Sequence, residues 1–193
     1  MDEIKIGCVL LAAGNSVRFG ENKLLTEIDG RLMIERALDA IPADKLCDIV
    51  VVTQYDSVKK LAEERGYSCV VNDRPQLGIS RSVKLGTTAL TDKCDGAIYM
   101  VADQPWLRRE SVSGMLDRFS KDPDSIISMS SGGKRGNPCI FPKACFDELC
   151  TLSGDKGGRA VIEKHKGSLI LYEVTERELA DIDTPDDISI KEQ

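Results

Sequence analysis

Short apolar runs alternate along the chain with stretches whose apolar residues recur every three or four positions. Residues 4–12 are almost wholly apolar, and residues 48–53 are rich in β-branched side chains, so both are predicted to be buried strands. Segments 68–72 and 96–103 have the same character. Between these runs the helical spacing predicts helices at 31–41, 56–66, 79–90 and 110–120.

This alternation predicts a parallel sheet. Strands joined through helices form right-handed crossovers that cover both faces of the sheet, and strands buried in this way are continuously apolar. The pattern changes at 125–142, where two strands joined by a glycine-rich turn predict an antiparallel pair. The remaining expected elements are two helices, a strand and a last helix, at 142–152, 157–165, 168–174 and from Pro185 onward. We therefore expect residues 1–193 to form a single doubly wound α/β domain with a mainly parallel sheet, helices on both faces and an antiparallel edge.

Composition narrows the class of partner. The chain has 193 residues, of which 41% are hydrophobic, enough for a core. Its net charge of -6 argues against a nucleic acid partner, because affinity for the phosphate backbone depends on an excess of Lys and Arg. No apolar run approaches the roughly 20 residues of a membrane span, and no secretory leader is recognisable. A soluble, cytoplasmic protein with no membrane partner is expected.

The cysteines and the histidine are not expected to form a catalytic or metal site. The seven cysteines include no Cys-x-x-Cys pair and are expected to be buried thiols in a reducing compartment rather than a zinc site or a disulfide framework. The single histidine, His165, lies between Lys164 and Lys166 and is expected on a solvated surface. A His-based triad or a His-rich metal site is therefore not expected.

The segment 9–25, VLLAAGNSVRFGENKLL, leads from the first strand into small, polar and basic residues. Ligands of open α/β sheets bind beyond the carboxyl ends of the strands, so this loop is the first candidate site. It is not a P-loop, because Gly14 and Gly20 are too far apart and no lysine follows the second glycine, nor is it a Gly-x-Gly-x-x-Gly loop. Small residues let a ligand approach the backbone, Arg18 supplies a guanidinium fork and Lys23 a mobile charge. Composition alone leaves open a phosphate-binding loop and an ordinary loop with surface cations.

The same loop carries a family resemblance. LAAGNSVRFGENK resembles the signature of the NTP-transferase superfamily, and LLTEIDGRLMIERAL continues it, except that Leu32 stands where proline is usual. Further stretches narrow the resemblance to the molybdenum cofactor cytidylyltransferase family: GISRSVKLG, VADQPWL, RGNPCIF, and SGDKGGRAVI with DIDTP. The matches run in order from Leu11 to Pro185, nearly the whole chain.

The resemblance implies a nucleotide-diphospho-sugar transferase-like fold and an Mg²⁺-dependent enzyme. The reaction would move CMP from CTP onto the terminal phosphate of the molybdenum cofactor (molybdopterin) and release pyrophosphate, with a molybdenum hydroxylase as candidate recipient of the product. The residues implied to bind the nucleotide are Leu11, Ala12, Ala13, Gly14, Lys23, Gly78, Ser80 and Ser82. Those implied on the acceptor side are Asn137, Pro138, Asp155, Gly157 and Arg159.

The resemblance also implies the catalytic groups. Arg18 and Lys23 would bind the departing phosphates and stabilise developing charge. Asp103, after an apolar strand, and Asp183, in a late segment, would be the ligands of Mg²⁺, which takes few protein carboxylates. The alternative role of Asp103 is that of a helix N-cap or a turn aspartate, and that of Asp183 is a cap of the last helix. Asp181 is the alternative to Asp183 as a ligand. The acceptor phosphate has a second pKa of about 6 and so needs no general base.

Two other interpretations stay open from the sequence. One is a related nucleotidyltransferase that uses another NTP or acceptor, such as GTP or a sugar or alditol phosphate. The other is a non-catalytic carrier that delivers the cofactor to a molybdenum hydroxylase. The joint presence of Arg18, Lys23 and Asp103 favours catalysis, because a carrier has no need of all three.

Overall fold

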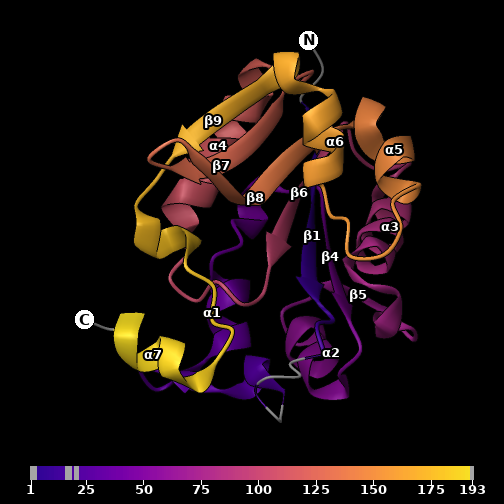
Figure 1. Cartoon of the computed structure of the whole chain (residues 1–193). Helices are drawn as coiled ribbons and strands as arrows, with labels where there is room; N and C mark the ends of the chain where they lie inside the picture. The colour runs from indigo at the N-terminus through magenta and orange to yellow at the C-terminus, as the bar shows by residue number, and fades with distance from the viewer. Residues whose placement is uncertain (1–3, 16–18, 20–21, 192–193) are drawn as a thin grey trace.

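A seven-stranded sheet with the strand order β5-β4-β1-β6-β8-β7-β9 forms the centre of the molecule (Figure 1). The computed structural model describes residues 4–15, 19 and 22–191. The strands are β1 (Ile6–Ala12), β4 (Asp48–Thr53), β5 (Ser68–Val71), β6 (Gly96–Val101), β7 (Ile126–Ser131), β8 (Lys134–Pro142) and β9 (Leu169–Glu173). β1 pairs in parallel with β4 and β6, and β4 with β5. β8 runs antiparallel to β6 and β7, so the mixed part of the sheet begins there and the expected α/β fold is confirmed.

Helices cover both faces of the sheet (Figure 1). They are α1 (Met33–Asp39), α2 (Asp56–Glu63), α3 (Ile79–Leu90), α4 (Arg109–Lys121), α5 (Phe146–Cys150), α6 (Arg159–Lys164) and α7 (Pro185–Lys191). Short 3-10 turns lie between them: η1 (Lys23–Leu25), η2 (Ala43–Lys45), η3 (Pro75–Leu77), η4 (Lys143–Cys145), η5 (Lys166–Ser168) and η6 (Glu176–Leu179). α1, α2 and α4 contribute to one apolar cluster, and α3, α5 and α6 to the other.

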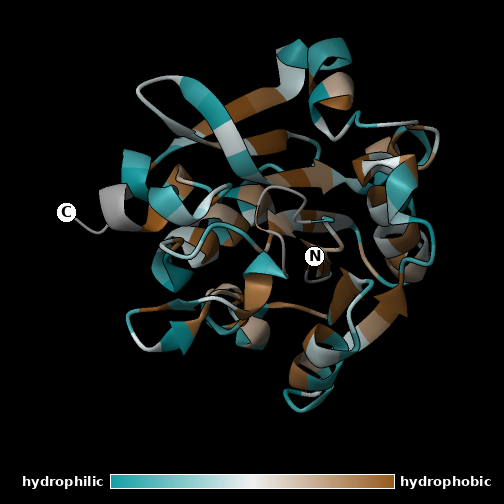
Figure 2. Ribbon diagram, turned by 60° about the horizontal axis from the view of Figure 1, so that its bottom comes forward, coloured by the Kyte–Doolittle hydropathy of each residue, from teal (hydrophilic) through white to brown (hydrophobic). Residues whose placement is uncertain are grey.

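The apolar pattern of the strands explains this three-layer arrangement. Successive side chains of a strand point to opposite faces. In β1, Cys8 and Leu10 therefore belong to the cluster under α1 and α4, whereas Val9 packs with the cluster under α3, and all three are fully buried. Figure 2 shows the result as hydrophobic strand segments in the middle of the molecule and hydrophilic residues on the surrounding helices and loops.

Several element boundaries lie a few residues from those predicted. The helix expected from residue 31 begins at Met33, because Arg31 and Leu32 form β3, which pairs with β2 (Glu27–Ile28) in a small second sheet. The Leu32 N–H bonds to the Glu35 carboxylate at 3.1 Å and so starts the helix. The strand expected to reach residue 103 ends at Val101, where the chain turns.

The register of the central strands brings three loops to one edge of the sheet. Ala12 lies beside Thr53 of β4, and Leu11 beside Val101 of β6. The segments that follow these strands, 13–15, 54–55 and 102–103, therefore begin side by side at the carboxyl edge. This edge is where ligands of open α/β sheets bind.

The structure also bears on the expectations for the cysteines, for His165 and for membrane-spanning helices. The seven cysteines are free; four are buried, while Cys47 is exposed. His165 is partly exposed, and its Nε2 lies 2.6 Å from the Glu148 carboxylate. Within the described residues, no helix has the length and apolar character needed to cross a membrane. The single-domain boundary at 1–193 stays a prediction.

Candidate active site

A cavity of about 260 Å³ opens at the carboxyl edge of the sheet. One wall is the loop after β1, and the opposite wall is the end of β6 with the turn after it. The start of α3 and the loop at Asp155 close the remaining side. The lining residues comprise Leu11, Ala12, Ala13, Gly14, Asn15, Lys23, Leu24, Pro75, Gly78, Ile79, Ser82, Val101, Ala102, Asp103 and Asp155.

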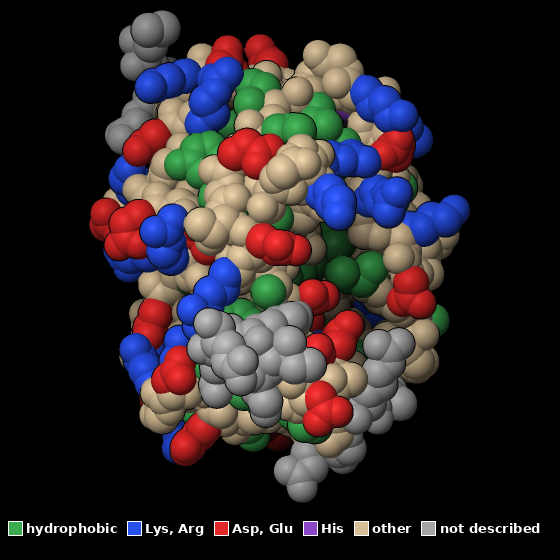
Figure 3. Space-filling view, turned by 60° about the vertical axis from the view of Figure 1, so that its left-hand side comes forward, with side chains coloured by type: hydrophobic (Ala, Val, Ile, Leu, Met, Phe, Trp, Pro, Cys, Tyr) green, Lys and Arg blue, Asp and Glu red, His purple; other side chains and the backbone are tan. Residues whose placement is uncertain are grey.

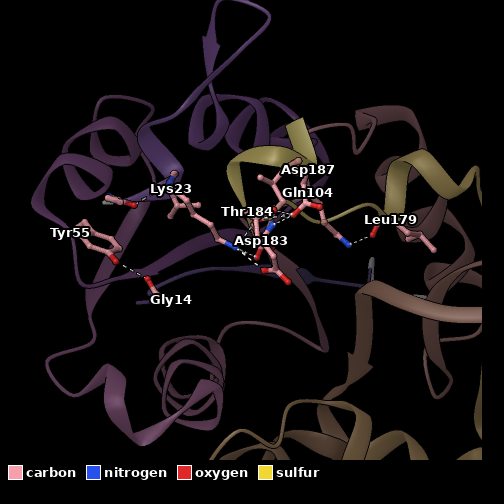
Figure 4. Close-up of polar contacts among 12 residues, drawn as sticks. Gly14, Lys23, Tyr55, Gln104, Leu179, Asp183, Thr184 and Asp187 are labelled. Carbon is pink, nitrogen blue, oxygen red and sulfur yellow. Dashed lines mark hydrogen bonds and ion pairs between the residues drawn. The ribbon is translucent and has the colours of Figure 1, made fainter. Parts of the chain in front are cut away.

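Of the residues that the structure describes, Lys23 is the cation that lines this cavity (Figure 4). Its ammonium lies 2.9 Å from an Asp103 carboxylate oxygen and 3.3 Å from one of Asp183, and donates to the Ile182 carbonyl at 2.7 Å. The turn η1 positions it: the Asn22 side chain accepts from the Leu24 N–H at 3.1 Å, and Leu24 is anchored in the core. A lysine on this turn therefore points at the carboxyl edge rather than into solvent.

Asp103 and Asp183 come from segments that are far apart in the sequence and hydrogen-bonded to each other. The Ala102 N–H donates to the Leu11 carbonyl at 3.1 Å and so extends the β1–β6 pairing into the turn. The Ile182 N–H donates to the Asp103 carbonyl at 3.0 Å, and the Ile182 side chain is fully buried. These contacts hold the C-terminal segment against the turn and carry the Asp183 carboxylate to Lys23.

The C-terminal segment has two further anchors (Figure 4). The Gln104 amide donates to the Leu179 carbonyl at 3.1 Å. The Asp187 carboxylate accepts from the N–H groups of Asp183 and Thr184 at 2.9 and 2.8 Å, which caps the start of α7 from within the helix. Asp183 thus lies in a loop that is held on both sides, and its side chain contacts Lys23, which lines the cavity.

The electrostatics of the three groups favour the charged lysine. Burial opposes the charge of the Lys23 ammonium, but the charges and hydrogen bonds of Asp103 and Asp183 outweigh it, so the pKa of Lys23 is raised above its ordinary value. Lys23 therefore carries its positive charge at neutral pH, and this charge lies between two carboxylates.

The two carboxylates also fit a divalent cation. Oxygens of both approach a single cationic atom, the Lys23 Nζ, so their positions suit a shared positive charge. Among the described residues no group of three or more His, Cys, Asp or Glu side chains could hold a metal. A divalent cation held by these two carboxylates would take its remaining ligands from water and phosphate oxygens.

The residues predicted to bind a nucleotide fall mostly on this cavity. Leu11, Ala12, Ala13, Gly14, Lys23, Gly78 and Ser82 line it. Ser80 is buried on another side of α3, where its N–H bonds to the Gly154 carbonyl at 3.2 Å, and it does not line the cavity. Arg18 lies outside the described residues.

The residues predicted on the acceptor side are divided between cavities. Asp155 lies on the first cavity, against Gly78. Asn137, Gly157 and Arg159 line a neighbouring cavity of about 140 Å³ that shares Leu11, Ile79 and Val101 with the first. Pro138, joined to Asn137 by a cis peptide bond, is buried in β8. The two cavities therefore lie next to each other and share a wall.

A third cavity, of about 500 Å³, extends the site toward the β7–β8 hairpin, where Lys134, Arg135 and Arg159 line it. Asp181 lies apart from Lys23, in a groove that also contains Lys134 and Arg177. Figure 3 shows Lys and Arg side chains gathered along one side of a hollow and Asp and Glu side chains on the other. The negative net charge is therefore not spread evenly over this face.

Sequence reasoning missed two sets of supporting residues. Thr53, Gln54 and Tyr55 bond to the loop after β1. Asn72, fully covered, donates to the Ser82 hydroxyl at 2.9 Å and so fixes a residue of the cavity wall. Polar residues directly after strands 48–53 and 68–71 were the available signal, because those strands end at the same edge as β1.

The fold and this site define the chain as a nucleotidyltransferase. It belongs to the MobA-like NTP transferase domain family, whose model matches residues 8–169.

Individual relatives agree with this assignment. Purine catabolism protein PucB of Bacillus subtilis (strain 168) is 28% identical over 191 residues, covering 93% of this chain and 92% of that protein. A probable molybdenum cofactor guanylyltransferase of Pyrococcus horikoshii is 34% identical over 120 residues, covering 61% of this chain and 58% of that protein.

The same fold occurs in solved structures. That of Rv0371c from Mycobacterium tuberculosis H37Rv has a TM-score of 0.84 at 23% identity, covering 98% of this chain and 99% of the other. A complex of Rv0371C with manganese has a TM-score of 0.78 at 22% identity, covering 97% of each chain.

Proposed function

We propose that this enzyme transfers CMP from CTP to the terminal phosphate of the molybdenum cofactor and releases pyrophosphate, with Mg²⁺ as its cation. The observation that carries the proposal is the convergence of Lys23, Asp103 and Asp183 at the cavity lined by the loop after β1. Relatives named as molybdenum cofactor guanylyltransferases support the acceptor. The manganese complex of a protein with the same fold supports a divalent cation.

The residues of the chain bind and orient the nucleotide. In this proposal the backbone from Ala13 to Asn15 and the Lys23 ammonium contact the triphosphate. Ser82 and Gly78 contact the nucleoside. Asp103 and Asp183 hold the cation, which when bound neutralises charge on the phosphate oxygens. Arg18 is proposed to bind the phosphates as well.

In the chemical step the protein is proposed to position the reactants and stabilise charge, without forming a covalent intermediate. A phosphate oxygen of the acceptor attacks the α-phosphorus of CTP; the new P–O bond forms as the bond to the bridging oxygen of the β-phosphate breaks, and pyrophosphate leaves. The acceptor phosphate is largely ionised at neutral pH, so no side chain has to remove a proton. Lys23 stabilises the departing pyrophosphate, and Asn137, Gly157 and Arg159 orient the acceptor in the neighbouring cavity.

The proposal includes a preference for CTP over GTP, to which Ala13 contributes. The Ala13 methyl group lies on the cavity wall and is largely buried, which leaves less room for a purine than glycine would. The guanylyltransferase relatives favour GTP as the second candidate. Both candidates use the same catalytic groups and differ only in the base.

The test is pyrophosphate release by the purified protein with Mg²⁺, each NTP in turn, and extracted molybdenum cofactor. We expect release that requires the acceptor and is fastest with CTP, together with a loss of turnover in Asp103→Asn. Fastest release with GTP would replace the cytidylyl assignment with the guanylyl one. No release with any NTP, in a protein that still binds the cofactor, would favour the non-catalytic carrier.

A further inference from the structure

Three consecutive side chains, beginning with the last residue of β4, bond to three consecutive carbonyls, beginning with the last residue of β1. The Thr53 hydroxyl donates to the Ala12 carbonyl at 3.0 Å, and the Gln54 amide to the Ala13 carbonyl at 3.0 Å. The Tyr55 hydroxyl donates to the Gly14 carbonyl at 2.7 Å (Figure 4). We propose that Gln54 and Tyr55 are positioning residues for the triphosphate, acting through the peptide groups that they hold; this inference rests on the proposed nucleotidyl transfer.

The strand register explains why the two rows meet. Ala12 is the partner of Thr53 in the parallel pair β1–β4, so the residues that follow each strand emerge side by side. The Thr53 hydroxyl also accepts from the Tyr55 N–H at 3.1 Å, which turns the chain and directs the tyrosine toward the loop. Gln54 makes a second bond, to the Asn15 side-chain oxygen at 3.0 Å.

A fixed carbonyl fixes the N–H of the next residue. In a trans peptide the two groups lie in one plane and point in opposite directions. Holding the carbonyls of Ala12, Ala13 and Gly14 toward β4 therefore directs the N–H groups of Ala13, Gly14 and Asn15 away from β4. β6 flanks β1 on that other side, and its end lines the cavity with Asp103.

The result is a set of donors on one side of the loop. In a strand, successive carbonyls alternate between neighbours, as those of Leu11 and Ala12 do here, bonding toward β6 and β4 respectively. The Ala13 carbonyl departs from that alternation, so the carbonyls of Ala12, Ala13 and Gly14 all bond to the β4 side. Within the described part of the chain, the N–H groups of Ala13, Gly14 and Asn15 form no hydrogen bond to another backbone group. Successive N–H groups on one side form an anion-binding concavity.

The experiment compares ligands that differ in phosphate number. Dissociation constants for CTP, CDP and CMP with Mg²⁺ are measured by calorimetry for the wild type, Tyr55→Phe and Gln54→Met. Each removed hydrogen bond is expected to weaken CTP and CDP binding by about 3- to 10-fold, while CMP binding stays within about 2-fold. Gln54→Met, which removes two bonds, is expected to have the larger effect.

The matched control is Tyr172→Phe, which removes a hydroxyl from a tyrosine on β9, at the opposite edge of the sheet from β5. Its CTP and CMP affinities should equal those of the wild type, and all variants should melt within a few degrees of it. Equal losses for CTP and CMP, or unchanged CTP affinity in both variants, would overturn the inference. A wild type that binds no NTP more tightly than its monophosphate would overturn the proposed function itself, and the inference with it.

Discussion

The Lys23 ammonium lies 2.9 Å from the Asp103 carboxylate, although the two residues are 80 positions apart in the chain. The same ammonium contacts Asp183, so one lysine occupies the space between the two carboxylates proposed to hold the cation. A divalent cation and Lys23 therefore compete for the same oxygens when no nucleotide is present. A triphosphate relieves the competition, because it offers Lys23 other anionic partners.

Lys23→Met tests that competition. Loss of the ammonium should tighten Mn²⁺ binding to the nucleotide-free protein by about tenfold, since a charge-assisted bond no longer has to be broken. The same substitution should weaken CTP binding by a similar factor. Titration of Mn²⁺ by electron paramagnetic resonance and of CTP by calorimetry measures the two effects. Unchanged CTP affinity would show that the loop after β1 does not hold the triphosphate through Lys23.

The assignment of Asp103 and Asp183, rather than Asp181, as ligands of the cation is tested by replacing each aspartate with asparagine. Asp103→Asn should lower kcat by at least about 100-fold, because stabilisation of the transferred phosphate by the cation is worth several kcal/mol. Asp183→Asn should cost about tenfold or more, and Asp181→Asn, which alters a separate groove, less than about twofold. Steady-state rates at saturating Mg²⁺ separate the three, with Asp117→Asn on the surface of α4 as control. A larger loss in Asp181→Asn than in Asp183→Asn would exchange the two assignments.

Ala13→Gly should reduce the preference for CTP over GTP without reversing it. Removing one methyl group from the cavity wall relieves a clash worth about 1–3 kcal/mol, or roughly 10- to 200-fold. The measurement is kcat/KM for both nucleotides with the same acceptor, in wild type and variant. An unchanged ratio would remove Ala13 from the base pocket, and a wild type that prefers GTP would overturn the cytidylyl proposal.

Gly78→Ala should destabilise the protein more than Gly66→Ala does. Both glycines have positive φ, at 85° and 78°, so alanine is strained at each by about 1–3 kcal/mol. A Cβ at Gly78 would also lie 2.5 Å from the Gly154 backbone, whereas a Cβ at Gly66 meets nothing within 4 Å. The overpacking adds about 1–3 kcal/mol, measurable by urea denaturation. Equal losses would mean that the loop at Gly154 moves aside without cost.

Glu178→Gln should make the free energy of unfolding depend less steeply on pH in the acidic range. Burial raises the pKa of this carboxyl, but its bonds to Arg108 and Ser111 outweigh the burial and hold the pKa below the ordinary 4.5. The unfolded chain therefore takes up the proton first, so the stability contributed by Glu178 is present above pH 4.5 and is lost as the pH falls through the lowered pKa. Urea denaturation between pH 3 and 7 should show a loss of about 1–3 kcal/mol at pH 7 in the variant. Glu64→Gln, at an exposed position, should keep the wild-type slope; an equally steep decline in Glu178→Gln would contradict the assignment.

The order of strands and helices and the position of the first loop were predictable from the amino-acid sequence alone. Burial on both faces demands continuous apolar runs such as 48–53, and this requirement is visible without a structure. Helix α3 has the predicted bounds, Ile79–Leu90, because its apolar positions follow one helical face. The boundary at Met33 was less predictable, because pairing of Arg31 and Leu32 with a short strand outweighs their helical spacing.

Which polar groups contact one another could be seen only in the folded chain. Asp183 reaches Lys23 from 160 positions away, through the pairing of Ile182 with Asp103 and the burial of the Ile182 side chain. The row of Thr53, Gln54 and Tyr55 depends on the register of β1 against β4. The periodicity of apolar residues shows which face of its own helix or strand a residue occupies. Strand register and the docking of loops depend on contacts between elements, so the local pattern does not predict the distances between residues of different elements.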